Sequence, residues 1–379
     1  MFKLLYQGID ALDIAFQGAL RPDVIEYLKT ARADAEEADE KQLITFGPGN
    51  VDAHVSPHGR KGGYRFVLDT GPEGAQWWLK ANLRRDGWNG FVTPKSGMLV
   101  TRSLDEVQQE IWETLGRMGF EVTGHTVNRV DYAMDFATEE FEPSPNQFVA
   151  HSNCKTKPHY GSKEIDDALP SVVTRGRRVE SVTIGKMPGR QIIVYDKRRD
   201  SIVKQKLWWF PVWGISKDDN SREIWRVEVR AGKKELKEKW NLRTVDELQS
   251  SLGDLVRRSL KDVRYVSPSK SDSNVSRRPS HPLWEAVVEA LNYDGALVGT
   301  GLLPSAVREV QRQIAIKTFK SLILGNAIGL ASALDWTTEE TKQLLAGEVA
   351  MEISKFLRCF PDDFDKKLRK ARARYTFLK

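Results

Sequence analysis

Apolar and polar residues alternate in short stretches over the first hundred positions, and Gly and Pro separate these stretches. Alternation with a period of two is typical of strands with one buried face. The pattern predicts strands at residues 9–16, 64–69, 76–80 and 97–101. An acidic segment at residues 22–41 interrupts them and is predicted to be a helix, since Pro22 suits a first helical turn.

Helical spacing of apolar residues appears further along the chain. Ser103 with Glu106, and Thr244 with Glu247, have capping-box spacing. These two signals predict helices that end near residues 118 and 263. Residues 267–282 are rich in Ser and Pro and nearly devoid of apolar residues, which indicates a flexible linker. Beyond the linker, helices are predicted at 283–291, 304–324 and 338–358.

Two predicted strands between these helices carry charged residues on one face and apolar residues on the other. Residues 129–136 place Arg129, Asp131 and Asp135 on one face. Residues 224–230 place Arg226, Glu228 and Arg230 on one face in the same way. Aspartate is disfavoured in strands, so this pattern favours a functional surface over an ordinary half-exposed strand.

A third predicted strand, residues 191–199, contains a tyrosine beside a lysine. Tyr195 and Lys197 are two positions apart and therefore share a face of the strand. An ammonium group there would favour the phenolate, which is the form that a tyrosine nucleophile needs. Taken alone, a Tyr-x-Lys pair is more often structural.

If the three charged faces align, their carboxylates are candidate metal ligands. Asp131, Asp135 and Glu228 would offer the oxygen atoms that Mg²⁺ or Mn²⁺ prefers. Arg129, Arg226 and Lys197 would then meet phosphate oxygens. The sequence has no His-x-His pair.

Composition adds a local argument about charge. The net charge of +6, from 58 basic and 52 acidic residues, is mild. Basic residues gather at 175–199 and 366–379, however, and clustered cations are what phosphate binding requires. Solvated surface is the alternative reading of either segment.

Cysteine content and hydropathy bear on the compartment. Only two cysteines are present, so a disulfide framework is not expected. The N-terminus lacks the apolar run of a signal peptide. The most apolar later stretch, residues 322–334, is too short to span a bilayer and contains Asn326. We expect a soluble, cytoplasmic protein without a membrane partner.

These motifs, in this order, resemble the replication initiation factor family. Its members are rolling-circle initiators of plasmids and filamentous phages, and relaxases of some conjugative elements. The resemblance covers roughly residues 8–234. It rests on Arg129-Val130-Asp131 with Asp135, on residues 183–185 leading through Arg190 to Val194-Tyr195-Asp196-Lys197, and on Arg226-Val227-Glu228.

The resemblance implies a nuclease domain related to the HUH endonucleases, with the histidine pair replaced by carboxylates. It implies Tyr195 as the nucleophile, assisted by Lys197. The remaining site residues that we expect are the metal ligands Asp131, Asp135 and Glu228, and the DNA-binding residues Arg129, Arg190, Arg226 and Arg230. Family members often have Gly-Ser before the tyrosine strand and Glu soon after the lysine, whereas Gly185-Lys186 and Asp200 stand here. This departure bears on substrate positioning.

The expected fold is therefore α+β, with an antiparallel sheet covered by helices on one face. We predict a DNA-nicking nuclease domain at 1–265, in two sheet-containing halves of about 1–101 and 102–265. A flexible linker at 266–282 and a helical C-terminal region at 283–379 would follow it.

The expected function is that of a rolling-circle replication initiator. Such an enzyme nicks one DNA strand, forms a 5′-phosphotyrosine link and leaves a free 3′-OH, with Mg²⁺ or Mn²⁺ as cofactor. Expected partners are origin DNA, single-stranded or as unwound duplex, together with a host helicase and polymerase. The alternatives are a sequence-specific DNA-binding protein without cleavage, a conjugative relaxase, and a metal-dependent hydrolase without a covalent step.

Overall fold

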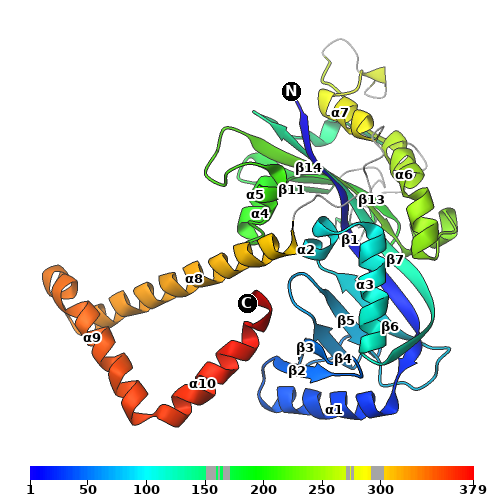
Figure 1. The fold of residues 1–379 in the computed structure, drawn as a ribbon. Helices are drawn as coiled ribbons and strands as arrows, with labels where there is room; N and C mark the ends of the chain where they lie inside the picture. Colours follow the sequence, from blue (N-terminus) through cyan, green and yellow to red (C-terminus); the bar gives the residue numbers. More distant parts are fainter. Residues whose placement is uncertain (151–158, 161–162, 165–170, 270–273, 275–276, 292–302) are drawn as a thin grey trace.

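The structure, a computed structural model, describes residues 1–150, 159–160, 163–164, 171–269, 274, 277–291 and 303–379. Its largest element is an antiparallel sheet of 11 strands in the order β11-β12-β13-β14-β7-β1-β6-β5-β4-β3-β2 (Figure 1). The strands are β1 (Lys3–Leu20), β2 (Gln42–Phe46), β3 (Val51–Val55), β4 (Phe66–Asp69), β5 (Ala75–Leu79), β6 (Trp88–Pro94), β7 (Phe120–Thr138), β11 (Ser171–Arg175), β12 (Arg178–Gly185), β13 (Arg190–Asp196) and β14 (Glu223–Gly232). The α+β class expected from the sequence is confirmed.

The two longest strands, β1 and β7, lie side by side in the middle of the sheet. Their pairing runs from Lys3 opposite Ala137 to Leu20 opposite Phe120, with several bulges. Strands from residues 1–101 extend the sheet on one side, and strands from residues 102–265 extend it on the other. Two small sheets, β9 (His159–Tyr160) with β10 (Lys163–Glu164) and β8 (Phe148–Ala150) with β15 (Val263–Tyr265), complete the strands.

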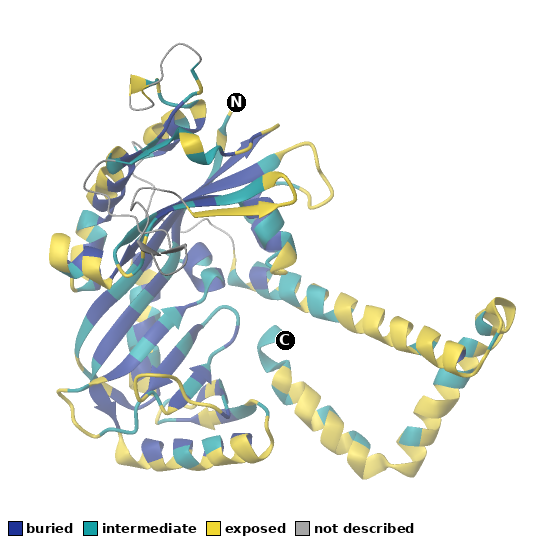
Figure 2. Ribbon diagram, turned by 180° about the vertical axis from the view of Figure 1, so that it is seen from behind, coloured by how far each residue is buried: buried dark blue, intermediate teal, exposed yellow. Residues whose placement is uncertain are grey.

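Four helices cover the apolar face of the sheet and form the main core with it. They are α1 (Pro22–Glu37), α3 (Leu104–Arg117), α6 (Val245–Asp262) and α7 (Pro282–Ala290). Both predicted capping boxes are present, Ser103 with Glu106 and Thr244 with Glu247. The predicted alternation of the central strands is confirmed, because Tyr132, Val194 and Val227 are all buried in this core. Figure 2 shows the buried strands in dark blue between partly exposed helices.

The opposite, charged face is also partly covered, which the sequence analysis did not expect. Helices α4 (Lys197–Val203) and α5 (Trp209–Trp213) lie against it, whereas α2 (Ser96–Thr101) buries Met98 and Leu99 in the main core. Trp209 and Trp213 join Tyr6 of β1 in a second buried cluster. Helices therefore cover both faces of the sheet. The second layer forms because three tryptophans, Trp208, Trp209 and Trp213, pack together against the sheet and are buried there.

Local predictions failed in two places. Residues 97–101 were predicted to be a strand but belong to helix α2. Four consecutive residues of this helix, from Gly97 to Val100, are buried. The predicted strand at 191–199 ends at Asp196, whose carboxylate accepts a hydrogen bond from the backbone N–H of Arg199 and caps α4. Lys197 therefore lies in a helix and not on the strand face of Tyr195. Strands β2, β3 and β6 were not predicted.

The C-terminal helices form an arm that leaves the body and returns toward it (Figure 1). They are α8 (Pro304–Ala333), α9 (Thr338–Cys359) and α10 (Pro361–Arg374), followed by a short turn at Thr376–Leu378. Helix α8 is longer than predicted, at 30 residues. An 18-residue window in it has a mean hydropathy of 1.3 and is 6% buried. By length and composition alone α8 is able to cross a membrane, so the expectation that this stretch is too short was wrong.

The chain joins the body and the arm through residues that include the predicted linker. Within the described part of that segment, Val266 is buried and forms a β-bridge with Ser280. The backbone N–H of His281 donates to the carbonyl of Tyr265. Helix α7 follows and packs Trp284 into the main core. The predicted domain boundaries stay predictions.

At Gly18 the backbones of β1 and β7 approach each other closely, and a substitution there tests this approach. Its φ is +141°, and a Cβ there would meet the backbone oxygen of Glu121. We expect Gly18→Ala to lower the free energy of unfolding by at least about 2 kcal/mol. Gly116 in α3 has nothing within 4 Å of a Cβ, so Gly116→Ala should raise it by up to about 1 kcal/mol. Urea unfolding measures both; a neutral Gly18→Ala would contradict the close approach.

Candidate active site

Tyr195 lies near the end of β13 on the charged face of the sheet, opposite Arg226 of β14. Its hydroxyl donates a hydrogen bond to Oε2 of Glu228 at 2.9 Å. Lys197, in the first turn of α4, places Nζ 3.4 Å from the same hydroxyl oxygen. A tyrosine held between a carboxylate and an ammonium group has the arrangement of a nucleophile with a base. The structure therefore brings Tyr195, Lys197 and Glu228 together.

The electrostatics around Tyr195 differ from the sequence-based argument. Burial, followed by the negative charge of Glu228, raises the pKa of Tyr195 well above its ordinary value, whereas Arg226 lowers it. Burial, followed by the charge of Arg226, lowers the pKa of Lys197. Tyr195 is consequently a neutral phenol at pH 7. Its proton must pass to an acceptor during an attack, and Glu228 is the carboxylate in hydrogen-bond contact.

Arg226 forms the most buried charged cluster of the sheet. Its guanidinium bonds both carboxylate oxygens of Asp135, at 2.5 and 2.7 Å, and Oδ1 of Asp10 at 2.6 Å. The indole N–H of Trp213 donates to Asp135 at 2.8 Å, and the Trp209 ring lies 4.4 Å from the guanidinium carbon. Burial raises the pKa of Asp10, but the positive charge of Arg226 outweighs burial and holds the pKa of that carboxyl well below its usual range.

A second charged cluster lies beside the first. Arg129 donates to both oxygens of Asp131, and Arg230 contacts Glu228 at 2.5 Å and Asp131 at 3.4 Å. Asp131 and Glu228 are thus neighbours, because Nε of Arg230 contacts both carboxylates. Burial raises the pKa of Asp131 to about 7, with the hydrogen bond from Arg129 lowering it and the charge of Glu228 raising it further.

The three predicted metal ligands do not converge. Asp131 and Glu228 adjoin one another, whereas Asp135 faces Arg226 and Trp213. Among the described residues no three His, Cys, Asp or Glu side chains form a group that could hold one ion. As arranged, the predicted set of three does not fit a single Mg²⁺ or Mn²⁺, since arginines take the oxygen atoms that an ion would need.

The four predicted DNA-binding arginines have different surroundings. Arg129 and Arg230 have side chains 34% and 28% exposed. Arg226 is fully buried, so contrary to the prediction it offers no surface to a phosphate. Arg190 is 9% exposed and pairs with Asp262 at 2.8 Å.

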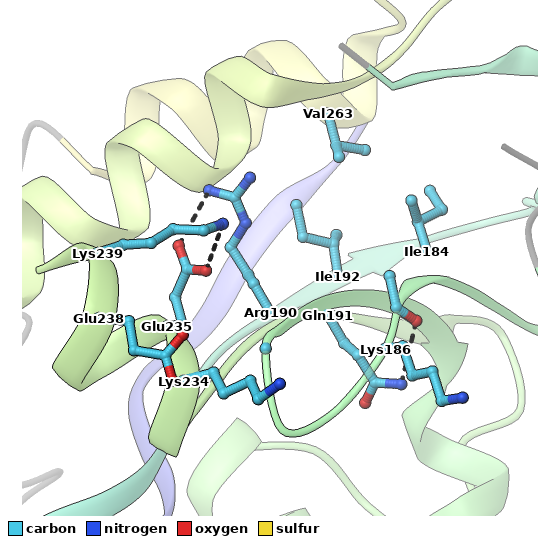
Figure 3. Close-up of a pocket in the computed structure, with 12 residues that line it drawn as sticks. Ile184, Lys186, Arg190, Gln191, Ile192, Lys234, Glu235, Glu238, Lys239 and Val263 are labelled. Atoms are coloured by element: carbon cyan, nitrogen blue, oxygen red, sulfur yellow. Dashed lines mark hydrogen bonds and ion pairs between the residues drawn. The ribbon is translucent and has the colours of Figure 1, made fainter. Parts of the chain in front are cut away.

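Arg190 is surrounded by acidic partners, which leave little of its positive charge for a phosphate. It lines a cavity of about 310 Å³ beside α6. Figure 3 shows its guanidinium turned toward Glu235, which also receives the Lys239 ammonium group; the Arg190–Glu235 distance is 3.8 Å. With two acidic partners, Arg190 ties β13 to the helical layer.

Beside Tyr195 a cavity of about 380 Å³ lies over β11, β12 and β13. Its charged lining is mixed. The cations are Arg199 of α4, Lys204 just after α4 and Arg230 of β14, and the carboxylates are Glu180, Asp196 and Asp200. Arg199 pairs with Glu180 at 2.8 Å, and Lys204 pairs with Asp200 at 2.6 Å. Tyr195 itself is half-buried, and its ring forms part of the wall. A phosphodiester that entered this cavity would meet the tyrosine together with three cations that are now paired with carboxylates, so phosphate binding would replace those ion pairs.

Three residues of the site, Asp10, Trp209 and Trp213, were not among the site residues predicted from the sequence. Their role as partners of Arg226 depends on strand order and helix packing. The only sequence signal was the presence of an aspartate inside a predicted strand.

Comparison with known proteins adds little. No family model matches this chain, and a search of curated proteins found no match. Among the solved structures that match is a rolling circle replication initiator protein from Geobacillus stearothermophilus, with 12% identity and a TM-score of 0.39. The match covers 76% of this chain and 97% of that chain. At this level, the similarity carries no argument about function.

The raised pKa of Asp131 predicts how stability depends on pH. The carboxyl binds a proton with a pKa of about 7 in the folded protein, against 3.8 ordinarily. The proton stabilises the fold below pH 3.8, and this contribution is lost as pH rises to about 7. Relative to Asp131→Asn, the wild type should lose roughly 1–4 kcal/mol of unfolding free energy across that window. Urea unfolding at each pH measures it; parallel curves would contradict the assignment.

Proposed function

We propose that this chain is a DNA nicking and closing enzyme of the rolling-circle initiator type, with Tyr195 as its nucleophile. The observation that carries the proposal is the contact of the Tyr195 hydroxyl with Glu228 and Lys197 at the wall of a cavity lined by charged side chains of both signs. A purely structural tyrosine needs one hydrogen-bond partner and no cavity beside its ring.

In the proposed reaction the Tyr195 oxygen attacks the phosphorus of a DNA phosphodiester. A new P–O bond forms to the tyrosine, and the bond from phosphorus to the 3′ oxygen breaks. The tyrosine proton passes to Glu228, and the departing 3′ oxygen takes a proton from water. The products are a 5′-phosphotyrosine and a free 3′-OH, and attack by that hydroxyl reverses the step and rejoins the strand.

The neighbouring residues would serve this reaction through charge and position. Lys197 lies within reach of the attacking oxygen and would stabilise its developing negative charge. Arg230 holds Glu228 from the other side, and it has enough exposed surface to meet a phosphate as well. Origin DNA is the proposed substrate, as a single strand or an unwound duplex, with a host helicase and polymerase acting after the nick.

Tyr195→Phe should abolish the covalent adduct and leave DNA affinity nearly unchanged, because only the nucleophilic oxygen is removed. The matched control is Tyr132→Phe on the opposite face of the sheet. It removes a buried hydroxyl that has no hydrogen-bond partner in the described part of the chain. Supercoiled DNA carrying the sequence that flanks the gene is incubated with each protein and Mg²⁺ or Mn²⁺, and protein-linked nicked circles are counted.

Other outcomes of that assay identify the alternatives. DNA bound by the wild type but left intact would favour a binding protein without cleavage. Nicks without attached protein would favour a hydrolase without a covalent step. An adduct formed as efficiently by Tyr195→Phe as by the wild type would show that Tyr195 is not the nucleophile. Rejoining at a transfer origin, and not at a replication origin, would favour a conjugative relaxase.

The requirement for Mg²⁺ or Mn²⁺ is a separate proposal. Asp131 and Glu228 are the two predicted ligands that adjoin one another, whereas Asp135 is held by Arg226. Arg129 and Arg230 now hold oxygen atoms of these carboxylates, so an ion would have to displace them. If an ion is required, EDTA stops adduct formation. Asp131→Asn should raise the concentration of Mn²⁺ needed to restore it, since a missing ligand weakens metal binding. Adduct formation that is unchanged in EDTA would contradict the metal requirement and leave the Tyr195 proposal standing.

A further inference from the structure

A third cavity, of about 590 Å³, lies between strands of the first half of the sheet and the segment that follows β14. Among the described residues that line it there is no Asp or Glu, and there are five cations: Arg60, Lys61, Lys233, Lys237 and Arg243. Within the described part of the chain none of the five forms an ion pair with a carboxylate. Burial, followed by the charges of Lys233 and Arg243, lowers the pKa of Lys237. Such a cluster repels itself and attracts an anion.

Aromatic rings form the rest of the wall. Trp88 is 41% exposed, and Tyr64 and Phe91 are half-buried. Behind them Trp78 stacks on Phe91 with ring centroids 4.7 Å apart. The guanidinium of Arg60 lies 3.8 Å from the centre of the Trp78 ring. The cavity therefore offers flat apolar rings next to cations.

One buried polar atom in the wall is unmatched. Thr126 of β7 lines the cavity and is 6% exposed, and its hydroxyl has no hydrogen-bond partner among the residues that the structure describes. A buried hydroxyl without a partner is costly. A polar ligand in the cavity would supply the missing bond.

The cavity and Tyr195 lie on the same face of the sheet. Ala15 in the cavity wall is two positions from Asp13, which pairs with Arg129. Asp131 is two positions from Arg129 on β7 and therefore lies on the same face, and it pairs with Arg230 of β14. Arg230 in turn contacts Glu228, the partner of the Tyr195 hydroxyl. A strand that crossed β1, β7 and β14 would reach both sites.

We propose that this cavity binds single-stranded DNA, with bases stacked on Trp88 and Tyr64 and phosphates held by Lys233, Lys237 and Arg243. Rings of this kind stack on unpaired bases, whereas the bases of a duplex are already stacked on each other. The proposal rests on the proposed function in one respect, namely that the bound strand is the one that Tyr195 cuts.

The test compares fluorescence anisotropy of the full-length protein with two labelled probes, a 15-nucleotide oligothymidylate and an abasic strand of equal length. Trp88→Ala should weaken oligothymidylate binding by about 10-fold and leave the abasic strand unaffected. Trp88→Phe, which keeps a stacking ring, should restore most of the affinity.

Charge is tested with the double variant Lys233→Glu and Arg243→Glu. It should weaken both probes by 10-fold or more and reduce the slope of log affinity against log salt by about 1.4, since each single-strand phosphate contact contributes about 0.7. The matched control reverses two exposed lysines of α9, Lys342→Glu with Lys355→Glu, and should change neither value.

Three outcomes would overturn the proposal: wild-type binding by both cavity variants, equal weakening by the α9 control, or a duplex bound as tightly as the single strand. Oligouridylate bound more tightly than oligothymidylate would assign the cavity to RNA instead of DNA. Adduct formation is measured on the same proteins. Binding through the cavity without any adduct would overturn the proposed function and keep this inference, whereas an adduct together with wild-type binding by the cavity variants would do the reverse.

Discussion

The pairing of Arg226 with Asp135 and Asp10 is the interaction on which the centre of this structure depends. It joins β14, β7 and β1 at side chains that are almost entirely removed from water. A buried guanidinium is tolerated only if carboxylates compensate its charge, and losing one partner of such a pair typically costs about 3–5 kcal/mol. The tryptophans of α5 close over the cluster, so the charged face is assembled around this single cation.

The arrangement of the candidate site follows from that cluster. Arg226 stands opposite Tyr195 in the strand register, and its positive charge works against the burial that keeps the phenol protonated. The same charge lowers the proton affinity of Lys197. Because Arg226 is committed to Asp10 and Asp135, the more exposed Arg129 and Arg230 remain to meet a substrate. In the proposed reaction the buried pairs would set the electrostatic potential at Tyr195, and the outer arginines would be available to a phosphate.

Alternation in the sequence was sufficient to separate the apolar and charged faces of the three central strands, because a strand carries that information in its own residues. Capping boxes located α3 and α6 for the same reason. The start of α4 had a local signal too, an aspartate three positions before Arg199, which the apolar run of β13 obscured. Asp135 was predicted as a metal ligand but is an ion-pair partner. That difference depends on which residue of β14 lies opposite it, and a single sequence does not contain the register between distant strands.

The continuity of the large sheet has a geometric consequence. Three strands, β14, β7 and β1, lie between Tyr195 on β13 and the aromatic wall on β6, and each step between neighbouring strands is roughly 4.8 Å, or roughly 19 Å in total. Backbone hydrogen bonds across β1 and β7 leave no hinge between the two halves. The distance between Tyr195 and the aromatic wall is therefore fixed by the sheet. A polymer bound at the aromatic wall would present a fixed position along its length to Tyr195.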